Sequence, residues 1–581
     1  MRATPGGRPF TSRRGLLIGL AGAGALSAVA GSVGVAVADH VSDAERPLPP
    51  GTPDSAHAMP DPDAAPRLGP WSRRNARRLE QLGRPNGSEI IWAENQHPGS
   101  VGWRLTKPGD DLRGQVKAYS SATSVNLGDE LDFHVSVRPA QEFTASIYRI
   151  GYYGGRGGRL VHRSPRIRGG SQPAATLHPG TKMVSCAWER SWTLRVPRTW
   201  VSGMYLAVFT NERGYQNVVP FVVREDEHPG AACVVLPFST YQAYNQFPLN
   251  MQDGRSLYLG YTAGGRGLDS LRSRAVSFDR PYHGDGMPSH VDKDIAFVQW
   301  AERMGYDVTY VTSVDLHAGR VRPNRHRAYL FPGHDEYWSS RMRQTAEQAV
   351  AGGAHLAMLT ANNLYWYVRF EPNEAGHPDR VMVCHKDRED PTRSRDPLGA
   401  TVQWRQLGHP EQAFLGSMYT GIIAGTAPLV VRNAEHWLWR GTRVRNGTRL
   451  PRLVGGEADC IHDGVELPRA VEYVQLSASP FRNQVGWKLE QNTTVYQAES
   501  GGWVFQAGTF NWPLALSSDR RYATPAIQRA TVNVLTRMLG PLPARASMSS
   551  PRPRRTREYP PGTVRPPLLR PSRPQERTIL L

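Results

Sequence analysis

Short runs in which apolar and polar residues alternate fill residues 85–225. Turn-forming residues separate these runs, which cover residues 115–119, 131–137, 144–150, 191–196, 203–209 and 217–223. Alternation with a period of two places the apolar side chains on one face of a β-strand. Several short strands at this spacing are typical of two packed antiparallel sheets. We therefore predict an N-terminal β-sandwich domain over residues 85–225.

The pattern changes after residue 225, where a continuous apolar run at residues 231–237 indicates a strand buried on both faces. Helical and strand-like segments then alternate. The predicted elements are a helix over 293–304, strands over 307–311 and 327–331, a helix from Ser339 or Ser340 to 350, a strand over 355–360 and a closing helix over 525–539. This alternation predicts a doubly wound sheet. The fold class is then α+β and multidomain, a sandwich followed by a flavodoxin-like or glutamine-amidotransferase-like α/β domain over 226–540.

The two ends of the chain have compositions that differ from the middle. Residues 1–38 contain Arg13 and Arg14 before an apolar run and a small-residue site at 36–38, which predicts a twin-arginine export signal. The alternative is an uncleaved signal anchor; after cleavage no stable membrane span is expected. Residues 39–84 are predicted to be a Pro-rich linker, and residues 541–581 a disordered, basic Pro/Arg tail. We expect an exported protein.

The net charge of +19 is concentrated at these ends. Residues 541–581 hold nine Arg and two Glu, and residues 1–38 hold four Arg and no acid, so only about eight positive charges remain on the middle. We therefore expect no nucleic-acid partner. The chain has four cysteines and no CxxC motif. Cys384 and Cys460 could form a disulfide in an exported protein, but buried free thiols are favoured.

Polar side chains follow three of the predicted strands. His334 and Glu336 come after the strand at 327–331, Asn362 after 355–360, and Tyr241 or Tyr244 after 231–237. Ligands of open parallel sheets bind at the carboxyl ends of the strands, so these side chains form a candidate site. The alternative is that the acidic turn at 334–336 only favours the start of the following helix.

Several segments resemble the large (β) subunit of N,N-dimethylformamidase and its relatives. They are residues 148–155 (YRIGYYGG), 239–245 (STYQAYN), 333–338 (GHDEYW), 402–405 (VQWR) and 508–513 (GTFNWP). The resemblance extends over roughly residues 88–539. It implies a mononuclear centre with one Fe(III) per chain, held by two tyrosinates and one glutamate, that hydrolyses a small amide or formamide.

The resemblance also implies roles for particular residues. Tyr241 and Tyr282 would be the phenolate ligands, with Tyr244 as the alternative to Tyr241, and Glu336 the carboxylate ligand. Oxygen donors suit a hard cation, which can act as a Lewis acid on an amide. The remaining roles would be taken by His334, beside the ligands or as a base, by Asn362, which would orient substrate or water, and by Glu457, which would handle the proton.

The expected partner is therefore a small-molecule amide. The small second subunit of the characterised enzyme is not visible in this chain, and a homo-oligomer stays open. One rival hypothesis is an exported, non-catalytic glycan-binding protein with a degenerate α/β domain. A second is a glutamine-amidotransferase-like hydrolase, but residues 333–335 supply no Cys or Ser nucleophile.

Overall fold

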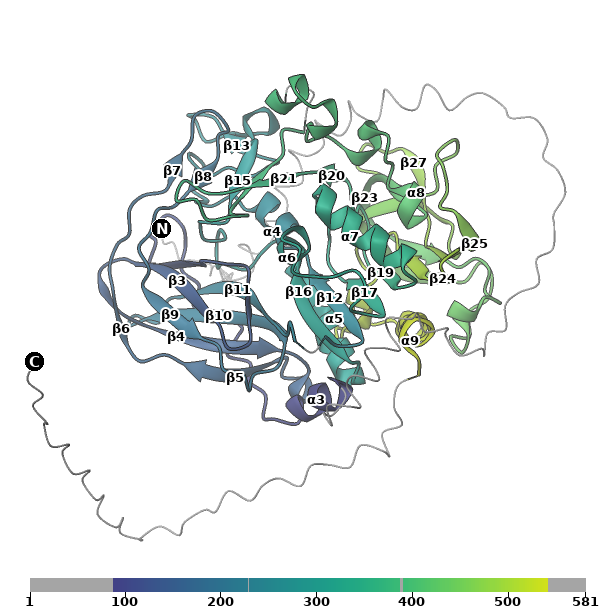
Figure 1. Cartoon of the computed structure of the whole chain (residues 1–581), viewed down its shortest axis with the longest axis horizontal. Coiled ribbons are helices and arrows are strands. Elements are labelled where there is room, and N and C mark those ends of the chain that lie inside the picture. Colours follow the sequence, from purple (N-terminus) through teal and green to yellow (C-terminus); the bar gives the residue numbers. More distant parts are fainter. Residues whose placement is uncertain (1–86, 228, 387–389, 542–581) are drawn as a thin grey trace, which may run out of the picture. The chain divides into compact units, whose positions relative to one another are not determined.

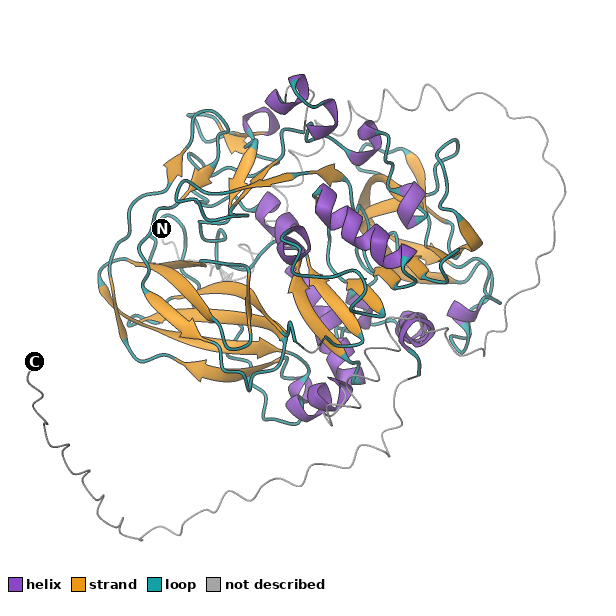
Figure 2. Ribbon diagram, viewed as in Figure 1, coloured by secondary structure: helices purple, strands orange, loops and turns teal. Residues whose placement is uncertain are grey.

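The computed structural model describes residues 87–227, 229–386 and 390–541. The signal predicted at 1–38, the linker at 39–84 and the tail after Pro541 lie outside the described residues. The described chain has an α+β architecture with several sheets and comparatively few helices (Figure 2).

Two sheets built mainly from antiparallel pairs form the first part of the described chain. One has the order β2-β11-β10-β4-β5, with β6 beside β4. Its strands are β2 (Ser124–Asn126), β4 (Gln141–Ile150), β5 (Gly158–Arg163), β6 (Ile167–Gly169), β10 (Gly203–Asn211) and β11 (Gln216–Arg224). The other has the order β1-β3-β9, from β1 (Val116–Ser120), β3 (Glu130–Val137) and β9 (Trp192–Arg195). Alternating side chains of both sheets, including Phe133, Phe209 and Phe221, share one hydrophobic cluster.

A mixed seven-stranded sheet forms the centre of the second part (Figure 1). Its order is β16-β12-β17-β19-β29-β28-β25. The strands are β12 (Ala232–Leu236), β16 (Val308–Thr312), β17 (Ala328–Phe331), β19 (His355–Met358), β25 (Ala470–Gln475), β28 (Thr494–Ala498) and β29 (Trp503–Gln506). The first five in this order are parallel to one another, whereas β28 and β25 join by antiparallel pairing.

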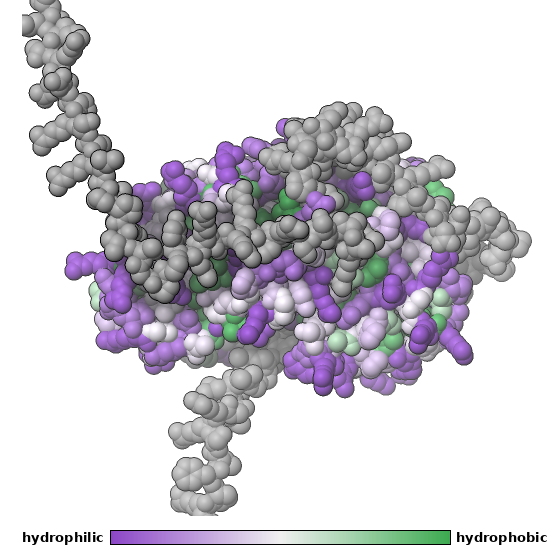
Figure 3. Space-filling view, turned by 90° about the horizontal axis from the view of Figure 1, so that it is seen from below, coloured by the Kyte–Doolittle hydropathy of each residue, from purple (hydrophilic) through white to green (hydrophobic). Residues whose placement is uncertain are grey.

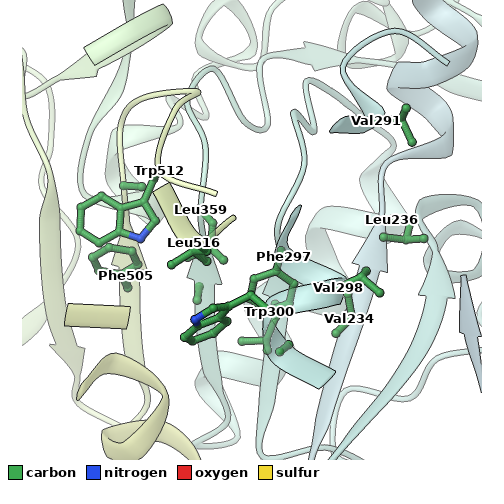
Figure 4. Close-up of a cluster of buried hydrophobic side chains, with 14 of the residues drawn as sticks. Val234, Leu236, Val291, Phe297, Val298, Trp300, Leu359, Phe505, Trp512 and Leu516 are labelled. Atoms are coloured by element: carbon green, nitrogen blue, oxygen red, sulfur yellow. The ribbon is translucent and has the colours of Figure 1, made fainter. Parts of the chain in front are cut away.

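Helices pack on both faces of this sheet, because its central strands are apolar on both sides. Helix α5 (Val291–Met304) and α9 (Pro525–Leu539) contribute to the same cluster as Val234 and Ala357, whereas α6 (Ser313–His317) and α7 (Ser340–Ala351) contribute to the cluster of Val235 and Leu356. Figure 4 shows part of the first cluster, in which Phe297 and Trp300 of α5 lie near Val234, and Trp512 lies over Phe505.

The helix boundaries follow from capping residues. The Ser339 hydroxyl accepts a hydrogen bond from the Met342 amide at the start of α7. Helix α5 ends at Gly305, whose φ of 78° is a left-handed conformation that favours glycine.

Short or peripheral elements complete the fold. Helix α4 (Phe238–Tyr244) follows β12, and a long hairpin of β23 (Met418–Val430) and β24 (Arg449–Cys460) lies beyond the sheet. The others are α3 (Gly87–Glu94), α8 (Gln412–Leu415), β7 (Thr176–Leu177), β8 (Val184–Ser185), β13 (Gly260–Tyr261), β14 (Gly267–Leu268), β15 (Ala275–Ser277), β18 (Tyr337–Trp338), β20 (Trp366–Tyr367), β21 (Arg369–Glu371), β22 (Val381–Val383), β26 (Ser479–Arg482) and β27 (Lys488–Gln491).

The first two sheets and the part of the chain around the seven-stranded sheet contribute to one hydrophobic core. Leu206 of β10 and Val218 of β11 belong to the same hydrophobic cluster as Tyr310 of β16 and Val298 of α5. The face shown in Figure 3 is mainly hydrophilic where residues are described, with hydrophobic residues scattered over it. Among the described helices, none has the length and apolar character needed to cross a membrane. All four cysteines are free thiols, so the disulfide alternative for Cys384 and Cys460 is not realised.

Candidate functional site

The carboxyl ends of three neighbouring parallel strands carry the candidate residues. Strand β12 pairs with β17, and β17 pairs with β19. Helix α4 with its two tyrosines begins directly after β12, the segment with His334 and Glu336 follows β17, and Asn362 follows β19. The three strand ends that the sequence places together therefore lie side by side, at the carboxyl-terminal end of the parallel strands.

Glu336 forms the centre of this site, with a carboxylate only 2% exposed. The Tyr244 hydroxyl donates a hydrogen bond to Oε2 at 2.9 Å, and the Tyr258 hydroxyl donates one to Oε1 at 2.5 Å. The two hydroxyl oxygens lie 3.2 Å apart. The backbone amide of Glu336 donates to Thr240 Oγ1 of α4 at 2.9 Å, which fixes the carboxylate against that helix. Two phenols and one carboxylate are thus gathered around one point.

The structure does not bring Tyr241 and Tyr282 to Glu336. The Tyr241 hydroxyl donates to Asp294 Oδ2 of α5 at 2.6 Å, so this phenol contacts α5 and not Glu336. Tyr282 lies near Tyr241 and Arg280, and its phenol is buried with a raised pKa. The two phenols that contact Glu336 are those of Tyr244, the stated alternative to Tyr241, and Tyr258.

Sequence reasoning missed Tyr258 because it lies in a segment without hydrophobic periodicity, between α4 and the short strand β13. Leu257 and Leu259 flank Tyr258, so no local pattern distinguished it from an ordinary core aromatic. The Lys386 ammonium lies 3.4 Å from the centre of the Tyr258 ring, 4.8 Å from that of Trp366 and 5.1 Å from that of Tyr337. Burial lowers the pKa of Lys386 to about 8, although Glu336 opposes the shift.

His334 is 1% exposed and is held at both ring nitrogens. Nδ1 lies 3.2 Å from the carbonyl oxygen of Ala361, and Nε2 lies 3.1 Å from Glu336 Oε2 and 3.3 Å from the Tyr244 hydroxyl. Burial alone would lower the pKa of His334, but the carboxylates of Glu457 and Glu336 outweigh it and raise that pKa. The imidazole is therefore held in a fixed position beside Glu336.

Glu457 and Asn362 complete the polar part of the site. Glu457 lies on β24, and its Oε2 is 3.8 Å from His334 Nε2. Burial raises the pKa of Glu457 to about 7, while His334 and a hydrogen bond from the Asn362 side chain oppose the shift. The backbone of Asn362 has a left-handed φ of 53°, and its amide donates to Asp459 Oδ1 at 2.8 Å. Glu457 Oε2 and Asn362 Oδ1 have no hydrogen-bond partner among the described residues, so both remain available.

The donor set suits a hard cation better than a soft one. Among the described residues, no three His, Cys, Asp or Glu side chains are grouped so that they could hold a metal ion. The oxygens of Tyr244, Tyr258 and Glu336 form the alternative set. Burial raises the pKa of both phenols well above its ordinary value, so they keep their protons unless a cation replaces them. With both protons displaced, the three groups would carry the charge that balances a trivalent ion.

A comparison with protein families identifies the family of this chain. The family model described as "N,N-dimethylformamidase beta subunit-like, C-terminal" matches residues 144–525, more than half of the chain. The chain belongs to this family. The matched range includes every residue of the site described above, and membership in the dimethylformamidase beta subunit-like family indicates a hydrolase-like function.

Other comparisons add little to the family assignment. No curated protein matches the dimethylformamidase-like chain significantly. A cycloisomaltooligosaccharide glucanotransferase from Paenibacillus sp., complexed with cycloisomaltoheptaose, is similar at 9% identity and a TM-score of 0.15. That match covers 54% of this chain, which spans about 61% of the glucanotransferase chain. A similarity this low carries no argument about function.

A second histidine of the dimethylformamidase-like chain also lies at the site. The His290 ring is 5.2 Å from that of Tyr244 and 5.7 Å from that of His334, measured between ring centres. Phe510 lies against both imidazoles, 4.4 Å from His334 and 5.6 Å from His290. Sequence reasoning missed His290 because it lies in a loop just before α5, with no strand end beside it.

Proposed function

We propose that this chain is a metal-dependent hydrolase of a small amide or formamide, with one Fe(III) held by Tyr244, Tyr258 and Glu336. The observation that carries the proposal is the pair of phenols that donate to the two oxygens of one buried carboxylate. Buried tyrosines ordinarily satisfy their hydroxyls separately. Two of them converging on a single carboxylate form a set of three hard donors, and the family name points to amide hydrolysis.

Each residue of the site has a part in the proposed reaction. Bound to these oxygens, Fe(III) would polarise the amide carbonyl and make water more acidic. The oxygen of the attacking water bonds to the amide carbon, and Glu457 accepts a proton from that water. Glu457 then returns the proton to the amide nitrogen as the C–N bond breaks. The products are a carboxylic acid and an amine. Asn362 holds Glu457, and His334 holds Glu336 and Tyr244 in place.

The proposal also extends to the domain folds, the export and the assembly of the chain. We propose that the first two sheets constitute a β-sandwich domain and that the seven-stranded sheet is flavodoxin-like or glutamine-amidotransferase-like. We further propose export by the twin-arginine route. The family is named for a β subunit, so a second subunit or a homo-oligomer is the proposed assembly.

Four tyrosine variants test the metal proposal. We expect wild-type protein to contain about one iron per chain and to show a visible tyrosinate-to-iron charge-transfer band. Tyr244→Phe and Tyr258→Phe each remove one proposed donor, so both should lose iron and weaken the band. Tyr241→Phe and Tyr282→Phe are matched controls, because neither hydroxyl reaches Glu336, and both should keep iron and colour. Elemental analysis and absorption spectra provide the readouts.

The outcomes separate the alternatives. Loss of iron in the Tyr241 and Tyr282 variants, with iron kept in the Tyr244 and Tyr258 variants, would restore the ligand pair expected from the sequence. Iron-free, colourless wild-type protein, prepared with iron supplied, that does not hydrolyse small amides would refute the proposed function.

A further inference from the structure

The two imidazoles at the site differ in how their nitrogens are used. His334 is almost fully buried and has a partner at each ring nitrogen: Ala361 on one side, Glu336 and Tyr244 on the other. His290 is only partly buried, and its contacts to Tyr244, His334 and Phe510 are made between rings. Neither ring nitrogen of His290 forms a hydrogen bond to any residue that the structure describes.

The backbone holds His290 in this place at some cost. It is the residue before α5 and has φ 67° and ψ 3°, a left-handed conformation that residues with side chains adopt infrequently. Such conformations persist where the surrounding structure imposes them, and they concentrate at functional sites. Here the conformation places an imidazole beside Tyr244 without a protein partner for its N–H group or its acceptor nitrogen.

We propose that His290 binds the substrate, by a hydrogen bond between its free ring nitrogen and the amide group. The inference rests on the proposed amide hydrolase function. An imidazole nitrogen without a protein partner, next to a candidate metal ligand, is the group still able to bind a ligand once His334 is committed to Glu336. Oε2 of Glu457, which has no hydrogen-bond partner among the described residues, lies 3.8 Å from Nε2 of the same His334. The two available groups thus lie beside the same fixed imidazole, where a small neutral amide can meet both.

Chemical modification tests this without relying on turnover. Diethyl pyrocarbonate acylates imidazole nitrogens that are accessible and unprotonated, and peptide mass spectrometry locates the product. We expect His290 to be modified well before His334, and N,N-dimethylformamide to slow the modification of His290. Exposed His97 is the internal control, because it should react at the same rate with and without the amide. The measurement works on iron-loaded and on metal-free protein.

Kinetics of His290→Asn provide the second readout. Asn tolerates the left-handed backbone but lacks the imidazole. Loss of one hydrogen bond made equally in the ground and transition states should raise KM for N,N-dimethylformamide about tenfold with kcat little changed. The iron content and charge-transfer band should stay as in wild type, and His97→Asn should behave as wild type throughout.

Each result has a distinct meaning. If His290 is modified no faster than His334, or if the amide leaves its modification rate unchanged in an active enzyme, the inference is wrong. An unchanged KM in His290→Asn also overturns it. If wild-type protein hydrolyses no amide yet the amide still protects His290, the proposed function fails while the binding inference stands.

Discussion

Glu336 and Glu457 are two buried carboxylates beside one histidine, yet their surroundings shift their pKa values in opposite directions. Burial would raise the pKa of Glu336, but His334 and Lys386 outweigh it and hold that pKa below its ordinary value. Burial dominates for Glu457 and raises its pKa to about 7. Two carboxyl groups with separated pKa values are suited to different tasks. An ionised Glu336 fits a metal ligand, and Glu457 fits a group that accepts and returns a proton near neutral pH.

This division of roles predicts the effect of Glu457→Gln. The amide cannot accept the water proton, so kcat for amide hydrolysis should fall about 10²- to 10⁴-fold. Because Glu457 is not among the proposed ligands, the iron content and the charge-transfer band should be retained. Steady-state kinetics with parallel iron analysis would check this, with Glu336→Gln as the comparison that should lose both activity and iron. A Glu457→Gln variant with wild-type kcat would remove Glu457 from the proposed mechanism.

Helix α4 presents its two tyrosines to different partners, Tyr244 to Glu336 and Tyr241 to Asp294 of α5. Sequence patterns placed α5, α7 and α9 well, since their end signals and apolar faces are local, but they predicted only the strand before α4 and not this helix itself. They could not decide which tyrosine of one helical turn faces the neighbouring strand end. They also gave no sign of Tyr258, His290 or the β23–β24 hairpin, whose positions depend on contacts between distant segments.

Burial of Asp294, the residue of α5 that contacts α4, makes stability depend on pH. Burial raises the pKa of Asp294 to about 7, although the hydrogen bond from Tyr241 opposes the shift. The folded protein therefore holds a proton on Asp294 that the unfolded chain releases above pH about 4. Relative to Asp294→Asn, wild-type protein should lose up to about 4 kcal/mol of unfolding free energy as pH rises from about 4 to about 7.

Denaturant unfolding of both proteins across this pH range measures the difference. Asp292→Asn, at a position that is 58% exposed on the same helix, is the matched control and should show a much smaller change relative to wild type, since the Asp292 charge only adds to the Asp294 shift. If the difference in unfolding free energy between wild type and Asp294→Asn does not change with pH, the Asp294 pKa is not raised in the folded state.

Across the whole molecule, a buried ion pair ties the first sheets to the second part. Arg149 of β4 contacts Glu302 of α5 at 2.7 Å, with side chains 1% and 0% exposed. Tyr310 of β16 donates to the same carboxylate at 2.9 Å, and Asn95 donates to it at 2.8 Å. The sequence pattern predicted the strands that carry Arg149 and Tyr310. It did not predict the Arg149–Glu302 ion pair, because a charged residue inside a strand ordinarily faces solvent.

Breaking this pair should destabilise the entire described unit. Arg149→Met leaves the Glu302 carboxylate buried without its cation, so the unfolding free energy should fall by about 3–5 kcal/mol. Arg195→Met is the matched control: its pair with Glu130 has the same 2.7 Å contact, but the side chains are 80% and 52% exposed, and its removal should change stability much less. Equal losses in both variants would show that burial does not set the importance of the pair.

The proposed ligands and the proposed base are encoded in separate stretches of the chain. Tyr244, Tyr258 and Glu336 come from α4, the segment after it and the turn after β17, whereas Glu457 comes from a hairpin more than a hundred residues further on. Mutations in the hairpin can therefore change proton handling, or the set of accepted amides, while the metal donors stay intact. Selection in the laboratory or in nature could diversify such a catalyst by varying β23 and β24 alone.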